Sequence, residues 1–244
     1  MTAVSPPAHL THMHVVVPAN DEEELLPRTL RTLHEAVAEL RRVRPRITAR
    51  VTLVLDACTD GSRELVLRHR DVRPVEVTYR CVGAARAHGV MVATAHVPGW
   101  QRGSHWLANT DADCAVPRDW LVRQAILADA GVDLVTGTVE PDSDELAPGV
   151  LAQWRALHEL RDGHHHVHGA NLGVRLSTYV DSGGFEPTPL HEDLGLVERV
   201  RASGATCVAS SALHLRTSGR LRGRAPGGFA HFLSELEPGT SLAG

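Results

Sequence analysis

The chain has 244 residues, of which 43% are hydrophobic and 22% are charged, and this composition indicates a folded protein with a sizeable core rather than a disordered one. The formal net charge is only −4, and no apolar stretch approaches the roughly 20 residues that span a bilayer, which argues against nucleic acid as a partner and against a membrane span. All 25 basic residues are arginine, so lysine-based Schiff-base chemistry and a Walker-type phosphate loop are excluded.

Short apolar runs alternate with amphipathic segments through the first half of the chain, which predicts strand–helix units in a mostly parallel sheet. Leucines at 30, 33 and 40, with Val37, recur at helical spacing and mark the buried face of a first helix, which Pro27 is suited to begin. The expected strands are residues 14–17, 51–55, 75–79 and 105–109. The next two helices are expected to follow the turn at 59–62 through about residue 70 and to cover residues 83–95.

The second half of the chain is less regular. Helices are expected over residues 117–130, 148–161 and 192–203, and strands over residues 134–139, 206–209 and 212–215. A histidine-rich loop precedes residues 169–173, and an arginine- and glycine-rich segment follows the last strand. Without an internal repeat or a linker, we predict a single domain over residues 13–232 whose halves meet after residue 113, an N-terminal extension (1–12) and a C-terminal tail (233–244).

The N-terminus and the cysteines bear on location. The first 14 residues lack a basic region followed by an apolar core, so no secretory signal is expected there. The four cysteines are widely spaced and form no Cys-x-x-Cys pair. We therefore expect reduced thiols and a cytoplasmic protein.

Two carboxylates, Asp111 and Asp113, come directly after the expected strand 105–109. Sheets of α/β proteins bind ligands at the carboxyl ends of their strands, and a divalent cation there could bridge carboxylate and phosphate oxygens. A second Asp-x-Asp pair, Asp142 and Asp144, lies in a polar loop between two prolines and is expected to be solvated. The first pair is therefore the candidate site.

Five short segments occur in a fixed order along the chain. They are Val-Val-Val-Pro-Ala-Asn-Asp-Glu (15–22), Val-Leu-Asp-Ala-Cys-Thr-Asp-Gly-Ser (54–62), Gly-Ala-Ala-Arg (83–86), Thr-Asp-Ala-Asp (110–113) and Glu-Asp (192–193). In order and spacing they resemble the family 2 glycosyltransferases of the GT-A fold, over about residues 13–230. Residues 169–175 and 224–229 are similar to segments of the small actinobacterial-type members. The resemblance implies a Rossmann-like α/β fold, with a nucleotide-binding half (13–113) and an acceptor half (114–232).

The resemblance implies a nucleoside pocket at the ends of the first two strands, lined by Pro18, Ala19, Glu22 and Asp56. A carboxylate at a strand end can accept hydrogen bonds from base or ribose groups. The segment around Asp56 departs from the commoner Asp-Asp-Gly-Ser turn, which leaves the nucleobase open. Gly83 and Arg86 would approach the diphosphate near the positive end of a helix, unless Arg86 is an ordinary surface arginine.

The same resemblance implies a metal site and a catalytic base. Asp113 would be the direct metal ligand, Asp111 would touch the metal, its bound water or the ribose, and His214 would be a third ligand unless it is a core or edge histidine. Asp193 is the preferred base for the acceptor hydroxyl and Glu192 the reserve. A pair of helix-capping carboxylates is the alternative for these two residues.

Two further segments receive roles from the resemblance. Asn171 would lie beside the donor sugar, where its amide can bond hydroxyl groups. A basic group would close over a diphosphate or an anionic acceptor as a lid, or else be a disordered tail; it comprises Arg216, Ser218, Arg220, Arg222 and Arg224. For the histidines at 164, 165, 166 and 168 we favour an acceptor loop or solvent exposure over a transition-metal site, because neighbouring side chains of an extended segment point in alternate directions.

The sequence thus predicts an enzyme that uses Mn²⁺ or Mg²⁺ to move one sugar from a UDP- or GDP-sugar to a small hydroxyl acceptor, with inversion. Processive synthases carry a Gln-x-x-Arg-Trp motif, which is absent, so a single transfer is expected. The alternatives are a retaining transferase like the glucosyl-3-phosphoglycerate synthases, a sugar nucleotidyltransferase, and a nucleotide-binding module without catalysis. The acidic residues after the first strand argue against the second, and the complete carboxylate set argues against the third. The donor sugar, the acceptor and homodimer formation stay open.

Overall fold

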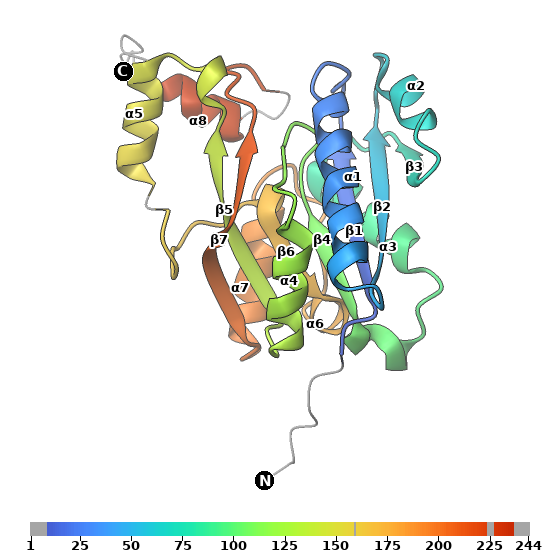
Figure 1. The fold of residues 1–244 in the computed structure, drawn as a ribbon. Coiled ribbons are helices and arrows are strands. Elements are labelled where there is room, and N and C mark those ends of the chain that lie inside the picture. Colours follow the sequence, from blue (N-terminus) through green and yellow to red (C-terminus); the bar gives the residue numbers. More distant parts are fainter. Residues whose placement is uncertain (1–8, 159, 224–226, 237–244) are drawn as a thin grey trace.

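The structure is a computed structural model, and it describes residues 9–158, 160–223 and 227–236. Seven strands form one sheet in the order β3-β2-β1-β4-β6-β5-β7 (Figure 1). The strands are β1 (His12–Ala19), β2 (Thr48–Asp56), β3 (Val72–Val77), β4 (His105–Asn109), β5 (Leu134–Pro141), β6 (Leu172–Arg175) and β7 (Cys207–Thr217). The first four strands are parallel, β6 is antiparallel to both β4 and β5, and β5 is parallel to β7. This mixed, mostly parallel sheet confirms the expected α/β class.

Helices cover both faces of the sheet (Figure 1). Side chains of α1 and α4 pack with Val15 and Val17 in one apolar cluster, and side chains of α3, α6 and α7 pack with Val16 in another. This division follows from the alternation of side chains along a strand. The α-helices are α1 (Leu26–Val43), α2 (Ser62–Leu67), α3 (Val82–Thr94), α4 (Trp120–Asp129), α5 (Pro148–Leu157), α6 (Leu176–Asp181), α7 (Glu192–Ala202) and α8 (Phe229–Glu235).

The second half of the chain departs most from the expected elements. The two strands expected at 206–209 and 212–215 form the single strand β7, whose pairing with β5 shifts register between Gly137 and Thr138. Strand β6 and helix α6 occupy a segment for which the sequence predicted no helix or strand. A four-residue strand is too short to show a clear alternation, so its pairing with β4 and β5 defines it.

Two features bear on location. In the described ranges, no helix combines the length and the apolar character needed to cross a membrane. All four cysteines are free thiols. The cytoplasmic location stays a prediction.

Candidate active site

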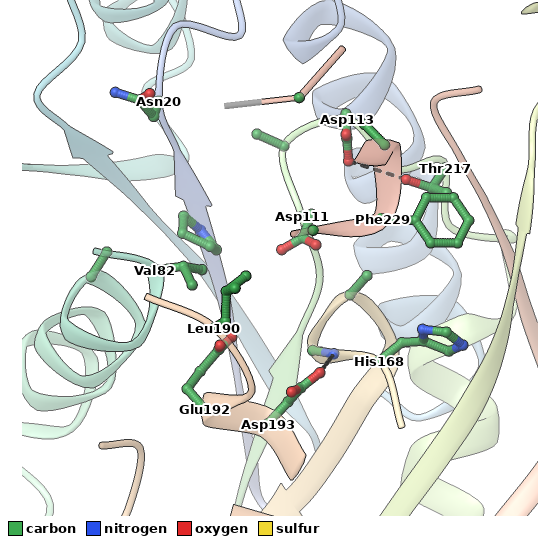
Figure 2. Close-up of a pocket in the computed structure, with 18 of the residues that line it drawn as sticks. Asn20, Val82, Asp111, Asp113, His168, Leu190, Glu192, Asp193, Thr217 and Phe229 are labelled. Atoms are coloured by element: carbon green, nitrogen blue, oxygen red, sulfur yellow. Dashed lines mark hydrogen bonds between the residues drawn. The ribbon is translucent and has the colours of Figure 1, made fainter. Parts of the chain in front are cut away.

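A cleft of about 710 Å³ opens beside the carboxyl ends of β1, β2 and β4. Because these three strands are parallel, the residues that follow each of them meet at one edge of the sheet. The opposite wall comes from the start of α7, the end of β7 and helix α8 (Figure 2). The cleft therefore brings together side chains from both halves of the chain. The lining includes Pro18, Ala19, Glu22, Asp56, Arg86, Asp111, Asp113, Glu192, Asp193 and Arg220.

Asp56 ends β2 and organises the backbone beside the cleft. Its two carboxylate oxygens accept hydrogen bonds from the backbone N–H groups of Arg80 (2.8 Å) and Cys81 (2.9 Å). Arg80 and Ala57 both have positive φ angles, 51° and 55°, a conformation that side chains other than glycine adopt at an energetic cost. The strained loop that leads into α3 is thus tied to the Asp56 carboxylate.

Arg86 is 1% exposed and links three elements at the floor of the cleft. Its Nη2 donates to Asp111 Oδ1 (2.5 Å), after β4, and its Nε donates to Glu192 Oε1 (3.0 Å), at the start of α7. Nη1 has no hydrogen-bond partner among the described residues. Burial by itself lowers the pKa of Arg86, but the carboxylates of Asp111, Glu192 and Asp193 outweigh it and raise the pKa. Arg86 is therefore a buried cation held by two carboxylates, and the two N–H groups of its Nη1 have no partner among the described residues.

Gly83 and Gly169 both stand where a larger side chain would clash with a neighbouring segment. A Cβ at Gly83 would lie 2.1 Å from the carbonyl oxygen of Glu186, and a Cβ at Gly169 would lie 2.8 Å from Arg86 Nη2. Gly83 therefore acts where α3 meets the segment before α7, and it does not line the cleft in the described part of the chain.

Asp111 and Asp113 form an acidic group with Cys114, whose potential ligand atoms all lie within 4.8 Å of one another. Burial and the neighbouring Asp111 raise the pKa of Asp113 to about 6, and Arg220 opposes this rise. Two carboxylates held this close would gain from a bound cation, and carboxylate oxygens are ligands that Mg²⁺ and Mn²⁺ prefer. The donor set therefore fits a divalent cation.

Arg220 and Thr217 cover this acidic group from β7 and the segment after it. Arg220 donates to both carboxylate oxygens of Glu22 (2.7 and 2.6 Å) and to Asp113 Oδ2 (3.0 Å). The Thr217 hydroxyl donates to Asp113 Oδ1 (3.2 Å) (Figure 2). A guanidinium group thus lies beside the acidic pair, as a lid residue would.

The neighbouring carboxylates of Glu192 and Asp193 differ in burial and in the groups they contact. Glu192 is buried against Arg86, and burial raises its pKa. Asp193 is more accessible; its Oδ2 accepts the backbone N–H of Gly169 (2.5 Å), and the side chain points into the cleft (Figure 2). His191, just before the pair, has a positive φ of 61°. Of the two carboxylates, Asp193 is the more exposed, and its other oxygen, Oδ1, accepts the backbone N–H of Leu194 (2.7 Å).

Besides Gly83, three residues that the resemblance assigned to the site make their contacts elsewhere. His214 contacts β5, with Nδ1 3.0 Å from Thr138 Oγ1 and Nε2 3.2 Å from Glu140 Oε2. Arg216 is exposed and joins Ala115 through backbone hydrogen bonds. Within the described ranges neither residue lines the cleft. Arg224 lies outside the described residues.

Asn171 is the third of these residues, and it is only 1% exposed. Its Nδ2 donates to the carbonyl oxygens of Thr138 (2.8 Å) and Leu213 (2.7 Å), and its Oδ1 accepts from Trp120 Nε1 (2.9 Å). The amide thus bridges β5 and β7 at their register shift. Both of its N–H donors are engaged inside the protein.

His168 and Phe229 form an uncharged wall of the cleft. For His168 the sequence predicted an acceptor loop or solvent exposure, and to Phe229 it assigned no role. Their rings meet edge to face, with centroids 6.4 Å apart (Figure 2). Burial and the neighbouring histidines lower the pKa of His168 to about 3, so its ring is uncharged. Phe229 lies in the quoted segment 224–229, but only the formation of α8 places it at the cleft.

The family model for glycosyl transferase family 2 matches residues 14–177, which include the cleft residues from β1 to the loop after β4. The chain belongs to this family. A search among curated proteins finds no match to this glycosyltransferase domain.

Solved glycosyltransferases share the fold. TarS from S. aureus, residues 1–349 with UDP-GlcNAc, is 14% identical with a TM-score of 0.63, over 89% of this chain and 61% of that one. Mannosyltransferase PcManGT from Pyrobaculum calidifontis, with GDP-Man and Mn²⁺, is 24% identical with a TM-score of 0.61, over 91% and 61%. GalNAc-T7, with UDP, GalNAc and Mn²⁺, is 13% identical with a TM-score of 0.60, over 88% and 46%. These likenesses confirm the GT-A fold, and the chain spans about 60% of the length of the TarS fragment.

Proposed function

We propose that this glycosyltransferase domain moves one sugar from a nucleoside diphosphate sugar to a hydroxyl acceptor with the help of a divalent cation. The observation that carries the proposal is the acidic pair Asp111–Asp113 at the carboxyl end of β4, in a cleft that Asp193 also lines. The solved relatives with UDP-GlcNAc or with GDP-Man and Mn²⁺ support this donor class.

The first half of the cleft would hold the donor. Pro18, Ala19 and Asp56 lie at the strand ends where the nucleoside would bind. Asp113 and Asp111 would hold Mn²⁺ or Mg²⁺, which when bound neutralises charge on the departing diphosphate. His214 is left out of this ligand set because it contacts β5 instead.

Two arginines would bind the diphosphate oxygens. Arg86 lines the floor of the cleft, where its positive charge would attract the diphosphate. Arg220 lies above the acidic pair, and its bond to Asp113 would be exchanged for bonds to the diphosphate when a cation takes over the charge of that carboxylate. The two guanidinium groups would thus stabilise the leaving group from opposite sides.

The second half of the cleft would bind the acceptor. Asp193 would take the proton from the acceptor hydroxyl while that oxygen attacks the anomeric carbon, so the product is inverted. The Gly169 N–H orients the carboxylate, and Glu192 holds Arg86 in place. His168 and Phe229 offer an uncharged wall that suits the apolar face of a sugar-like acceptor.

The proposal is tested by calorimetric titration of the purified chain with UDP-, GDP-, UDP-sugar and GDP-sugar ligands, with and without Mn²⁺. We expect one nucleotide class to bind more tightly with Mn²⁺, and Asp113→Asn to abolish that gain. Asp144→Asn is the matched control and should behave as the wild type. Asp144 is the exposed member of the second Asp-x-Asp pair; Asp142, which was expected to be solvated, is instead buried and pairs with Arg28 at 2.7 Å. If no nucleotide binds more tightly with Mn²⁺, the proposed function is wrong.

A further inference from the structure

Three potential metal ligands converge between α1 and the turn that joins α2 to β3. His34 comes from α1, and His69 and Asp71 come from the turn. One ligand atom of each residue lies within 4.8 Å of the other two. His34 Nε2 is 2.9 Å from Asp71 Oδ2, and the two imidazole rings are 5.1 Å apart with a tilt of 34°. This group lies at the amino end of β3, whereas the catalytic cleft lies at the carboxyl ends of the strands.

The backbone and the core hold these three residues in place. Leu30 and Leu33 bury the face of α1 beside His34. The His69 N–H donates to the carbonyl oxygen of Val66 (2.9 Å), and the His69 carbonyl oxygen accepts from the N–H of Val72 (3.1 Å). Val66 and Val72 are themselves buried. The ligand positions are therefore largely set before any ion binds.

The Nε2 atom of His34 is buried without a hydrogen bond to any described residue, as an unoccupied metal ligand would be. Its Nε2 has almost no exposed surface and makes no hydrogen bond in the described part of the chain, although the Asp71 carboxylate is 2.9 Å away. The contact to the exposed Asp71 carboxylate, outside hydrogen-bonding geometry, replaces the lost bonds of this nitrogen to water only in part. A metal ion between the three side chains would satisfy it.

We propose that His34, His69 and Asp71 bind a transition-metal ion of the Zn²⁺ type. Zn²⁺ takes histidine nitrogen and carboxylate oxygen at about 2.0–2.2 Å in tetrahedral geometry, which requires ligand atoms roughly 3.3 Å apart. The three ligand atoms already lie within reach of that spacing. Two imidazoles favour such an ion over Mg²⁺ or Ca²⁺, which prefer oxygen. Water would occupy the fourth position.

A bound ion would link helix α1 to the segment that begins the edge strand β3. Among the described strands, β3 lies at the edge of the sheet and pairs with β2 alone, and α1 contacts α2 and β2. The ion would tie α1 to the start of β3 and bind the folded chain only, so it would raise the melting temperature. Asp71 also borders a cavity with Arg70 and Arg73, and these positive charges limit the affinity.

The test titrates Zn²⁺ into metal-stripped protein at about pH 7.5, where metal binding competes little with protons, and follows heat and melting temperature. All variants carry Asp113→Asn, which silences the catalytic cleft. We expect one Zn²⁺ per chain in this background and a loss of affinity of at least about tenfold on adding His34→Ala, His69→Ala or Asp71→Asn. Asp71→Asn keeps the size of the side chain and serves if a histidine variant fails to fold.

His231→Ala is the matched control. His231 forms an exposed pair with Glu235 at 3.5 Å, which is one histidine and one carboxylate without a second histidine. Its removal should leave the affinity for Zn²⁺ and the rise in melting temperature unchanged. The proposal is overturned if the background protein binds no Zn²⁺, or if binding and the rise in melting temperature survive His34→Ala and Asp71→Asn.

Discussion

The two halves of the cleft differ in how directly the sequence places their side chains. In the first half, Asp56, Asp111 and Asp113 each end or closely follow a parallel strand, and all three line the cleft. In the second half, His214 and Asn171 were assigned to the site by the same resemblance, yet both contact neighbouring strands instead. The end of a parallel strand determines where a side chain lies, whereas a position in a bulged or antiparallel region depends on the register of its neighbours.

The largest expected effect contrasts Asp113 with His214. We expect Asp113→Asn to lower sugar transfer by about 10³-fold or more, because the cation would lose its main charged ligand. We expect His214→Ala to retain activity close to that of the wild type, because its ring contacts Thr138 and Glu140. Initial rates against Mn²⁺ concentration measure both. A loss in His214→Ala that extra Mn²⁺ restores would return this histidine to the metal site.

The next effect concerns the two neighbouring carboxylates of α7. Asp193→Asn should lower kcat by about 10²-fold or more while donor binding is retained, because the acceptor hydroxyl loses its base. Glu192→Gln should weaken donor binding instead, because Arg86 loses a charged partner. Steady-state kinetics and calorimetry separate the two. Full transfer by Asp193→Asn would favour a retaining mechanism.

A smaller effect is expected at Asn171 and falls on stability. Asn171→Ala leaves two carbonyl oxygens and the Trp120 N–H without their partner in the protein interior. Each such loss costs about 1–3 kcal/mol, so the free energy of unfolding should fall clearly in urea titrations. The folded fraction should still bind the donor. A variant with unchanged stability and lost donor binding would instead place this amide at the sugar.

The smallest effect is expected at the amino ends of the central strands β1 and β4, where His14 and His105 lie in contact. His14 Nε2 is 2.8 Å from His105 Nδ1. Burial, together with neighbouring histidines, lowers the pKa of His14 to about 3 and that of His105 to about 4, from an ordinary value of 6.5. Well above pH 6.5 both rings are neutral in the folded and in the unfolded chain, so they add no pH dependence there.

As the pH falls from 6.5 toward about 4, these two histidines bind protons in the unfolded chain but stay largely neutral in the folded chain. The free energy of unfolding should therefore fall over this range. Urea titrations between these pH values measure the slope. His105→Gln should flatten the slope of stability against pH. His88→Gln is the control and should leave the slope unchanged, because His88 contacts Tyr79 and not the two buried histidines. An unchanged slope in His105→Gln would show that other groups cause the acid sensitivity.

Much of the fold was predictable because its signals are local. Apolar runs bounded by turns marked β1, β2, β4 and β5, and the periodic leucines marked the buried face of α1. Strand β3 begins at Val72, three residues before the expected start at residue 75. Strand β6 and helix α8 were not predicted, because the first depends on its partners and the second is a short helix beside a glycine-rich segment.

Short sequence patterns were enough to predict the fold class and the carboxylates at the strand ends, because both follow from patterns a few residues long. Which charged side chains meet depends on the folded chain. Arg86 joins Glu192 across 106 positions, and Arg220 reaches Glu22 across 198. In the folded chain Asn171 also points inward, and His34 lies beside Asp71. Such contacts depend on strand order and register, which no local pattern encodes.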